Sequence, residues 1–182
     1  MGPASSIAAA LIGPPGAGKT TLANALVNLG YLLVRVRGPE PACALVRSGE
    51  LLADGMASLS VTQQLDETPP GAHIVIDGFP RTLSQAKALD TWATRSGAHI
   101  VPVLIEPADA ELRLRMISRS KSCQRPDDDA RILARRQLIY FERTTQIVRH
   151  YETRGCLARY SNEPTRDISH SINAIVTRQR SG

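Results

Sequence analysis

The residues with the clearest chemistry stand near the start of the chain, in the run Gly-Pro-Pro-Gly-Ala-Gly-Lys-Thr at residues 13–20. This run fits G-x-x-x-x-G-K-S/T, the pattern of a loop whose glycines let backbone N–H groups face a phosphate. Lys19 would supply positive charge for the outer phosphates, and Thr20 would offer its hydroxyl to Mg²⁺. A glycine-rich turn between two core elements is the alternative interpretation. The expected phosphate-binding residues are Gly13, Gly16, Ala17, Gly18, Lys19, Thr20 and Thr21.

A second candidate site begins at Asp77, which closes the apolar run His-Ile-Val-Ile-Asp. A carboxylate at the end of a strand can hold, through water, a Mg²⁺ that is bound to nucleotide phosphates, although it could also only cap the next turn. Arg81 stands at the start of a predicted helix, where the helix dipole disfavours a cation unless an anion compensates it. Its planar fork suits phosphate, whereas the alternative is a surface arginine. We therefore expect Thr20 and Asp77 at a metal site and Arg81 at a phosphate.

Short apolar runs alternate with segments of helical spacing. The predicted strands cover residues 7–12, 31–36, 73–77, 99–105 and 156–160, and the predicted helices cover residues 20–29, 51–65, 82–96, 109–120, 128–154 and 169–178. This alternation predicts an α/β fold, a three-layer, doubly wound P-loop sheet of about five parallel strands with flanking helices. Because ligands bind at the carboxyl ends of such strands, the glycine loop, residues 77–81 and the turn at Gly38 should share one edge.

Composition narrows the class of protein and its partners. A chain of 182 residues fits one domain, and its net charge of +5 suits nucleic acid, membrane surfaces or small anions. Aromatic residues make up only 4%, which argues against base stacking on single strands. No apolar run is long enough to span a membrane, and no charged segment marks a signal peptide. Widely spaced Cys43, Cys123 and Cys156 suggest a reducing compartment. We expect a cytoplasmic monomer that binds small-molecule nucleotides and neither nucleic acid nor membrane.

The run Asp-Gly-Phe-Pro-Arg-Thr at residues 77–82 resembles the signature of adenylate kinases and related nucleoside monophosphate kinases. The resemblance implies ATP and Mg²⁺ as cofactors and a nucleoside monophosphate as acceptor. It also implies that Gln85 reads the adenine of that acceptor, whereas on its own Gln85 would be a solvated helix residue. The implied acceptor-site residues are Leu51, Leu52, Gly78, Phe79, Pro80, Arg81, Gln85, Arg125 and Arg136.

Four further arginines follow a spacing that also resembles this family in its short-lid form. Arg115 and Arg119 are four apart and so share one helical face, Arg125 follows a short loop, and Arg136 comes later in the long helix. Alone, they could be solvated surface arginines. The resemblance implies that Arg115 stacks on the donor adenine, and that Arg119 also serves the donor. It implies too that Arg119, Arg125 and Arg136 surround the transferred phosphoryl together with Lys19 and Arg81, and that residues 120–127 form a short lid.

The chain departs from the family between residues 38 and 66, where the acceptor-binding lobe is reduced. The second predicted strand ends in Arg-Val-Arg-Gly-Pro-Glu, whereas the family has Ser-Thr-Gly-Asp followed by a helix with an acceptor-phosphate arginine. That arginine has no match here, and Arg37 or Arg47 is a candidate substitute.

Three functions stay open for the single domain of residues 1–182. The favoured one is phosphoryl transfer from ATP to a nucleoside monophosphate, with AMP preferred because of Gln85. The second is a P-loop kinase of another small metabolite, with the acceptor lobe remodelled for it. The third is a nucleotide-binding regulatory module without transfer activity, against which the intact set of cationic residues speaks.

Overall fold

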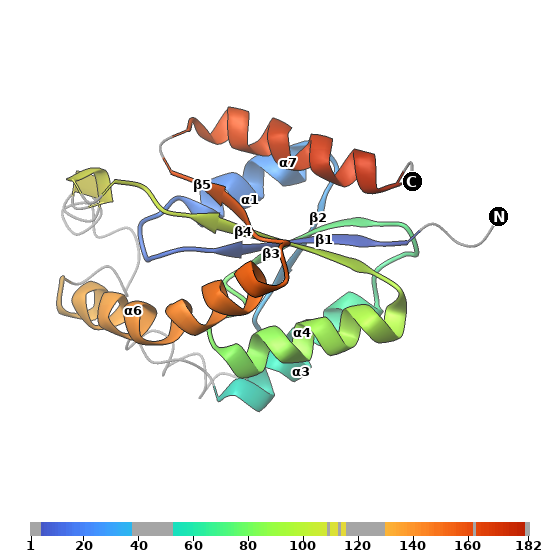
Figure 1. Cartoon of the computed structure of the whole chain (residues 1–182), viewed down its shortest axis with the longest axis horizontal. Coiled ribbons are helices and arrows are strands. Elements are labelled where there is room, and N and C mark those ends of the chain that lie inside the picture. The colour runs from blue at the N-terminus through green and yellow to red at the C-terminus, as the bar shows by residue number, and fades with distance from the viewer. Residues whose placement is uncertain are drawn as a thin grey trace.

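The protein folds around one five-stranded sheet with helices on both faces (Figure 1). The computed structural model describes residues 5–37, 53–108, 110–112, 114–115, 130–161 and 163–180, with only the backbone at 130–136 and 179–180. Within these ranges, no helix combines the length and the apolar character needed to cross a membrane.

The sheet is parallel throughout and has the strand order β2-β3-β1-β4-β5. Its strands are β1 (Ile7–Ile12), β2 (Leu32–Arg35), β3 (His73–Asp77), β4 (His99–Ile105) and β5 (Ala158–Tyr160). All five predicted strands are confirmed, and β1, β3 and β4 have the predicted bounds. The two edge strands, β2 and β5, are shorter than predicted. The predicted three-layer α/β fold is therefore confirmed.

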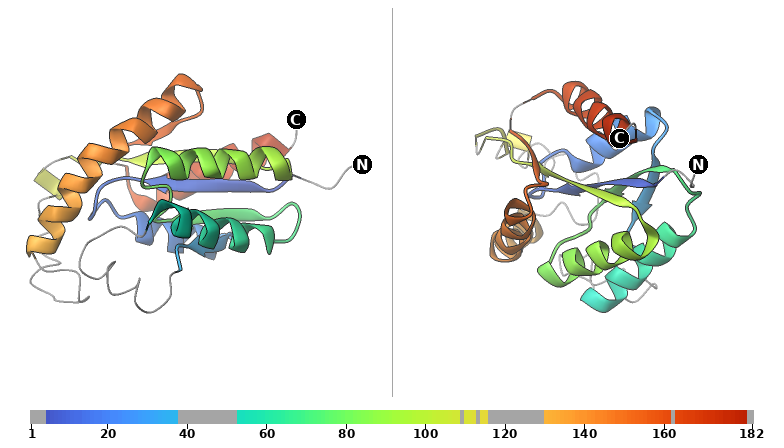
Figure 2. Two further views of the ribbon diagram at one scale, coloured as in Figure 1. Left: turned by 90° about the horizontal axis from the view of Figure 1, so that it is seen from below. Right: turned by 45° about the vertical axis from the view of Figure 1, so that its right-hand side comes forward.

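Helices cover both faces of the sheet, as the views in Figure 2 show. They are α1 (Lys19–Asn28), α3 (Asp54–Asp66), α4 (Leu83–Ser96), α6 (Ala130–Thr153) and α7 (Thr165–Arg180). Helices α1 and α7 lie on one face, and α3, α4 and α6 lie on the other (Figure 1). Of the predicted helix 109–120, residues 110–112 and 114–115 are helical, and the rest lies outside the described residues.

The central strand β1 is buried along its whole length and supplies both faces of the core. Ile7, Ala9 and Leu11 pack with α1 and α7. Ala8 and Ala10 pack with α3 and α4. This alternation follows from the two-residue repeat of a strand, and burial on both faces explains why the run is entirely apolar.

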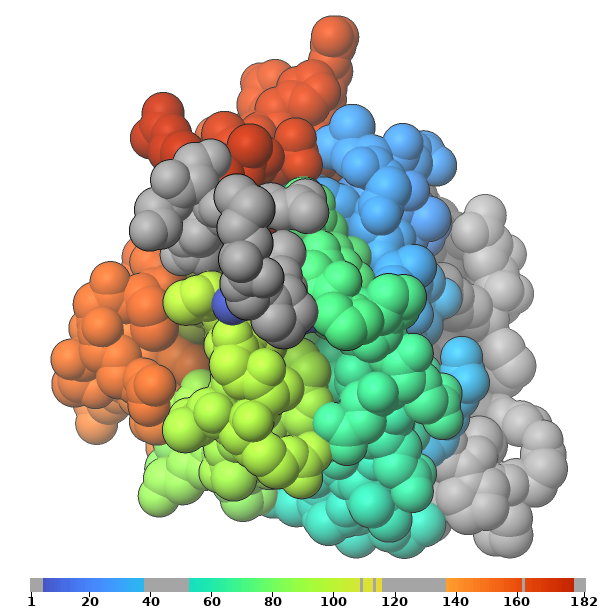
Figure 3. Space-filling model, turned by 90° about the vertical axis from the view of Figure 1, so that its right-hand side faces the viewer, coloured from blue at the N-terminus to red at the C-terminus, as the bar shows by residue number. Residues whose placement is uncertain are grey.

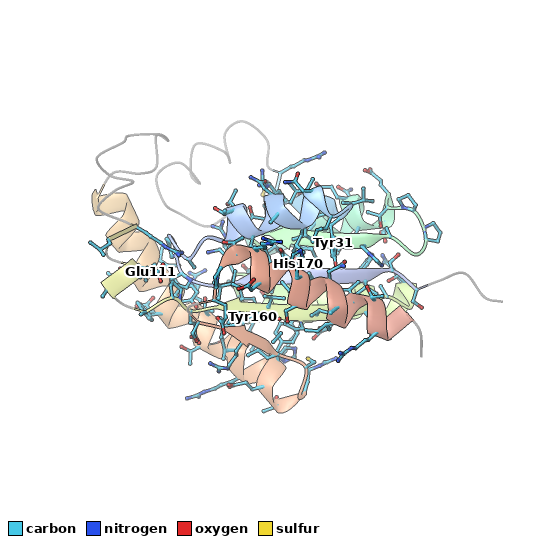
Figure 4. The ribbon with its side chains drawn as sticks, turned by 90° about the horizontal axis from the view of Figure 1, so that it is seen from above. Tyr31, Glu111, Tyr160 and His170 are labelled. Carbon is cyan, nitrogen blue, oxygen red and sulfur yellow. The ribbon has the colours of Figure 1, made fainter. Side chains whose placement is uncertain are left out.

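Helix α7 is tied to the strands beneath it by two tyrosines (Figure 4). The Tyr31 hydroxyl, just before β2, lies 3.4 Å from Asn173 Oδ1, and burial raises the pKa of Tyr31 to about 12. The Tyr160 hydroxyl, on β5, lies 2.8 Å from Ser171 Oγ. The closing helix therefore bridges the sheet from one edge strand to the other.

Helix α4 has the predicted boundaries to within one residue, whereas α7 begins at Thr165, four residues before its predicted start, and within the described residues α3 begins at Asp54. Thr82 caps α4, its hydroxyl accepting from Gln85 N at 3.3 Å, and Gly97 ends that helix at φ +68°. Leu29 ends the predicted helix 20–29, but α1 ends at Asn28 and Leu29 is 41% exposed. On α6, Ile147 is buried, whereas the neighbouring Gln146 is exposed.

The turns into β3 and β4 and the glycine loop lie at opposite ends of the sheet. At the amino ends of the strands, the turns that lead into β3 and β4 close over the sheet (Figure 3). There Ile7 N donates to Ala72 O at 3.0 Å, and His99 N donates to Ser6 O at 2.9 Å. The glycine loop follows β1 at the opposite end, so the expected phosphate site lies at the carboxyl ends of the strands.

Candidate active site

The loop between β1 and α1 has a backbone path that needs its glycines. Gly13, Gly16 and Gly18 have φ values of +153°, +86° and +90°. A Cβ at Gly13 would also lie only 2.5 Å from the carbonyl oxygen of Ile105. Non-glycine residues rarely adopt such φ values, so these positions require glycine. Because glycine has no Cβ, the loop backbone stays accessible at the start of α1. Such a helix start, with N–H groups and a positive dipole end, is suited to phosphate.

Lys19 reaches back over this loop. Its Nζ donates to Gly13 O at 2.6 Å and to Pro14 O at 2.7 Å. The loop is further held by a hydrogen bond from Ala17 N to Pro14 O at 3.1 Å. The ammonium group is thus positioned against the loop, beside the N–H groups expected to hold phosphate.

Thr20, Asp77 and Arg35 meet at a single carboxylate oxygen. Thr20 Oγ1 donates to Asp77 Oδ2 at 3.0 Å, and an Arg35 NH2 nitrogen lies 3.2 Å from the same oxygen. The strand register explains this meeting, because Asp77 on β3 stands beside Leu11 on β1 and beside Arg35 on β2. The structure therefore brings together the two expected metal-site residues. Hydroxyl and carboxylate oxygens are the hard donors that suit Mg²⁺.

Arg35 is a site residue that the sequence patterns do not reveal. Its number falls within the predicted strand 31–36, but the identity of its neighbour depends on the register between β2 and β3. The sequence offers one indication of this role. The predicted strand ends in Arg-Val-Arg, so two cationic residues follow at the edge of the sheet where Asp77 is also expected.

The turn after Asp77 folds back on itself. Gly78 has φ +85°, the Phe79–Pro80 peptide bond is cis, and Arg81 Nε donates to Gly78 O at 2.8 Å. Phe79 is fully buried in the core, and Pro80 is buried too. Arg81 is exposed. Among these expected acceptor-site residues, the Arg81 side chain is therefore accessible to a ligand, whereas the Phe79 side chain packs in the hydrophobic core.

Gln85 is not a solvated helix residue, the interpretation that its position alone favoured. It is 2% exposed, its Oε1 accepts from Arg81 N at 2.7 Å, and its Nε2 donates to Asp54 Oδ1 at 3.0 Å. The solvated interpretation failed because the helical pattern of α4 does not reveal that Asp54 of α3 stands opposite.

Asp54 joins the start of α3 to the start of α4. Besides the Gln85 amide, it accepts from Thr82 Oγ1 at 2.8 Å and from Ser84 Oγ. Burial acts to raise the pKa of Asp54, but hydrogen bonds from Ser84, Thr82 and Gln85, helped by the charge of Arg143, outweigh it and leave that pKa below its ordinary value of 3.8. The carboxylate therefore stays ionised and fixes the orientation of the Gln85 amide.

Arg115 lies against the glycine loop from a part of the chain far along the sequence. Its NH1 nitrogen is 3.3 Å from Ala17 O, and a Cβ built at Gly18 would be 3.3 Å from the same nitrogen. Its NH2 nitrogen donates to Glu111 Oε1 at 2.6 Å. Figure 4 labels Glu111 at the end of the sheet where the strands finish. The structure therefore places Arg115 beside the expected donor site.

The remaining expected residues are described only in part. Thr21 is exposed on α1, next to Thr20. Arg136 belongs to α6 by its backbone, but its side chain is not described. The following lie outside the described residues: Arg47, Leu51, Leu52, Arg119, Arg125 and the expected lid at 120–127.

The fold and this site define a class of protein. A parallel sheet with a glycine loop after its central strand, and an acidic residue ending the adjacent strand, is the arrangement of a P-loop nucleotide-binding domain. A family model described as an AAA domain matches residues 12–134.

Known relatives narrow the class further. The chain is 34% identical to an adenylate kinase of Thermus thermophilus over 170 residues, covering 86% of this chain and 89% of that one. It is 36% identical to the adenylate kinase of Synechococcus strain RCC307 over 180 residues, covering 91% and 96%. It is 37% identical to the adenylate kinase of Prochlorococcus marinus strain MIT 9313 over 160 residues, covering 80% and 85%. The chain belongs to the AAA-domain family of P-loop proteins and, more narrowly, to the adenylate kinase family. The predicted class of enzyme, a nucleoside monophosphate kinase, is thereby confirmed.

Proposed function

We propose that this protein transfers the γ-phosphoryl group of Mg²⁺-bound ATP to AMP and so forms two molecules of ADP. The observation that carries the proposal is the meeting of Thr20 and Asp77 at 3.0 Å, directly beside the glycine loop and the Arg81 turn. The groups that we propose to bind the donor, the metal and the acceptor thus share one edge of the sheet. Membership of the adenylate kinase family supports AMP as the acceptor.

The donor half of the reaction is assigned to the loop and the start of α1. The loop N–H groups and Lys19 would hold the phosphates, and Arg115 would lie on the adenine of ATP by stacking. Thr20, and Asp77 through water, would hold the Mg²⁺, which when bound neutralises charge on the phosphates. Lys19 is already positioned by two loop carbonyls, so its charge needs little rearrangement when ATP binds.

The acceptor half is assigned to residues that follow β3. Gln85 uses one N–H on Asp54 and one lone pair on the Arg81 amide, which leaves one donor and one acceptor. That pair complements the donor and acceptor on one edge of adenine. Because Gln85 is 2% exposed, adenine must replace the groups that now cover it. Arg81 would meet the acceptor phosphate.

The chemistry needs positioning and charge rather than a protein nucleophile. An oxygen of the AMP phosphate attacks the γ-phosphorus of ATP, and the bond from that phosphorus to the β-phosphate oxygen breaks as ADP leaves. Lys19 and Arg81 would face the charge that spreads over the moving group. Arg119, Arg125 and Arg136 are proposed to complete this set of cations.

The proposal extends to the organisation of the protein. Residues 1–182 would act as one domain and as a cytoplasmic monomer, with a reduced acceptor lobe at 38–66 and a short lid at 120–127. Its partners would be small-molecule nucleotides, because the aromatic content of 4% supplies few surfaces for stacking nucleic-acid bases.

A coupled assay that follows ADP formation with AMP, dAMP, CMP, UMP and GMP tests the proposal. We expect the highest kcat/KM with AMP. The Lys19→Met variant is the background control for contaminating kinase. No turnover above that background with any nucleoside monophosphate would reject the proposed function.

A further inference from the structure

The acceptor of the proposed reaction carries a phosphate dianion, and the described part of its lobe offers few cations to hold it. Helix α3, the one helix described between β2 and β3, has the sequence DGMASLSVTQQLD and contains neither lysine nor arginine. Its first turn carries an acidic residue, Asp54. Any positive charge that the described elements offer the acceptor phosphate therefore comes from outside α3.

Arg35 is such a charge. It ends β2, stands in register with Asp77 on β3, and places an NH2 nitrogen 3.2 Å from Asp77 Oδ2. The Arg35 side chain is 44% exposed, whereas that of Asp77 is 10% exposed. The ion pair thus holds the guanidinium at the site while leaving much of it open to solvent.

The guanidinium has donors to spare. Arginine presents five N–H groups, and among the described residues the Arg35 side chain contacts one carboxylate oxygen through one nitrogen. Two anions can therefore be bound at once, Asp77 on one side and a phosphate on the other. Arginine is suited to this role because its planar fork matches phosphate oxygens.

Arg37 is placed differently, although it is two residues further along. It lies beyond the end of β2 and is exposed, and its backbone N donates to Ser60 Oγ at 2.9 Å. Within the described residues, no carboxylate holds the Arg37 side chain toward the glycine loop. Preorganisation favours Arg35, because a side chain already fixed by Asp77 loses less freedom on binding.

We infer that Arg35 contacts the phosphate of the acceptor nucleotide, bridging it to Asp77 and thereby supplying an acceptor-side positive charge that α3 does not offer. The inference rests on the proposed function. This contact would place the attacking oxygen of the acceptor phosphate next to Asp77, the carboxylate proposed for the metal site. Arg35 would thereby orient the acceptor while the bond between that oxygen and the γ-phosphorus forms. Arg35 itself exchanges neither atoms nor a proton in this step.

The experiment compares Arg35→Met and Arg35→Lys with the wild type and with Arg95→Met. Arg95 is the matched control, since it also pairs with an aspartate, Asp66 at 2.9 Å, but at the C-terminal ends of α3 and α4. KM for AMP and for ATP are measured by coupled assay, and AMP affinity is measured by isothermal titration. The melting temperature reports whether each variant folds.

For Arg35→Met we expect KM and Kd for AMP to rise at least about tenfold, because hydrogen bonds to a charged phosphate are lost. KM for ATP should change less than about twofold, as should both constants in Arg95→Met. Arg35→Lys should recover part of the AMP affinity, since it keeps the charge but not the fork. It also decides the question if the methionine variant does not fold.

Three results would overturn the inference while leaving the proposed function intact. One is unchanged AMP affinity in both Arg35 variants. Another is a change confined to the Mg²⁺ concentration required for half-maximal rate, which would mean that Arg35 serves Asp77 alone. The third is a loss of AMP affinity in Arg37→Met but not in Arg35→Met. A wild type that is inactive with every nucleoside monophosphate would instead remove the proposed function, and this inference with it.

Discussion

Thr20 Oγ1 donates a hydrogen bond of 3.0 Å to Asp77 Oδ2, although the two residues are 57 positions apart. Thr20 lies in the first turn of α1, the helix after β1, and Asp77 ends β3, the neighbour of β1 in the sheet. Parallel strands bring both residues to the same edge. Two potential oxygen ligands for Mg²⁺, one from a helix and one from a strand, are thereby fixed beside the glycine loop.

This pairing predicts how the enzyme depends on Mg²⁺. In Asp77→Asn the carboxylate charge is lost, and we expect the Mg²⁺ concentration for half-maximal rate to rise by about tenfold or more, as for other groups that act on a metal through water. A titration of activity with Mg²⁺ at fixed ATP measures it. Asp66→Asn is the control, because Asp66 binds Trp92 Nε1 at the other end of α3. Equal Mg²⁺ requirements in both variants would contradict the assignment.

Lys19 is expected to act mainly on the chemical step. Replacing it with methionine removes a cation that two loop carbonyls already position. The expected loss in kcat is at least about 10²-fold, the size found when a preorganised transition-state donor is removed. The exposed Lys87→Met on α4 serves as control and should keep wild-type kinetics. A Lys19→Met enzyme within a few-fold of wild type would show that the phosphate loop works without this charge.

Replacing Arg115 should weaken the binding of ATP and leave the binding of AMP unchanged. Because stacking of a guanidinium on an aromatic ring contributes about 0.5–2 kcal/mol, Arg115→Ala is expected to raise KM for ATP roughly 2- to 30-fold. KM for AMP should stay the same. Glu111→Gln separates the two roles of this side chain, since it breaks the ion pair at 2.6 Å but keeps the guanidinium. If Glu111→Gln reproduces the whole effect of Arg115→Ala, the ion pair rather than stacking is responsible.

The glycine loop makes a prediction about stability that does not depend on activity. Gly13 has φ +153°, and an added Cβ would meet Ile105 O at 2.5 Å. Gly13→Ala should therefore lower the free energy of unfolding by at least about 2 kcal/mol, measured by urea denaturation. Gly55, inside α3, has open space around a built Cβ. Gly55→Ala should leave stability unchanged or raise it by up to about 1 kcal/mol. Equal losses in the two variants would contradict the account of the loop.

Much of this site could be predicted because its signals are local. The glycine loop needs a strand before it and a helix after it, and residues 7–12 and 20–29 indicate both by their apolar spacing. The sharing of one edge by the loop and Asp77 follows from parallel pairing alone. The position of Arg81 at this edge is predictable because Arg81 follows β3, the strand that ends in Asp77.

What could not be predicted depends on contacts between elements. The Arg35–Asp77 ion pair requires the register of β2 against β3, which the residues of neither strand specify. The burial of Gln85 requires Asp54 on another helix to satisfy its amide. The face of α6 that is buried, with Ile147 inside and Gln146 outside, depends on how that helix packs against α4.

Asp54 should make stability depend on acidity. Its pKa in the folded protein is lower than the ordinary 3.8, so below that pH the unfolded chain binds more protons than the folded one. The stability that Asp54 contributes is thus complete above its unfolded pKa and is lost as pH falls through the folded pKa. Urea denaturation of wild type and Asp54→Asn, from neutral pH down to about 3, measures this contribution. The difference in free energy of unfolding between wild type and Asp54→Asn should shrink below pH 3.8. A difference that does not change with pH would contradict this role of Asp54.

The most direct test of phosphoryl transfer follows the group itself. Protein is mixed with AMP and with ATP radiolabelled in its γ-phosphoryl group, and the products are separated by ion-exchange chromatography. The account predicts that the label leaves ATP and appears in the terminal phosphate of ADP, in proportion to the AMP consumed. Label that stays in ATP, or that appears only as inorganic phosphate while AMP is unchanged, would contradict it.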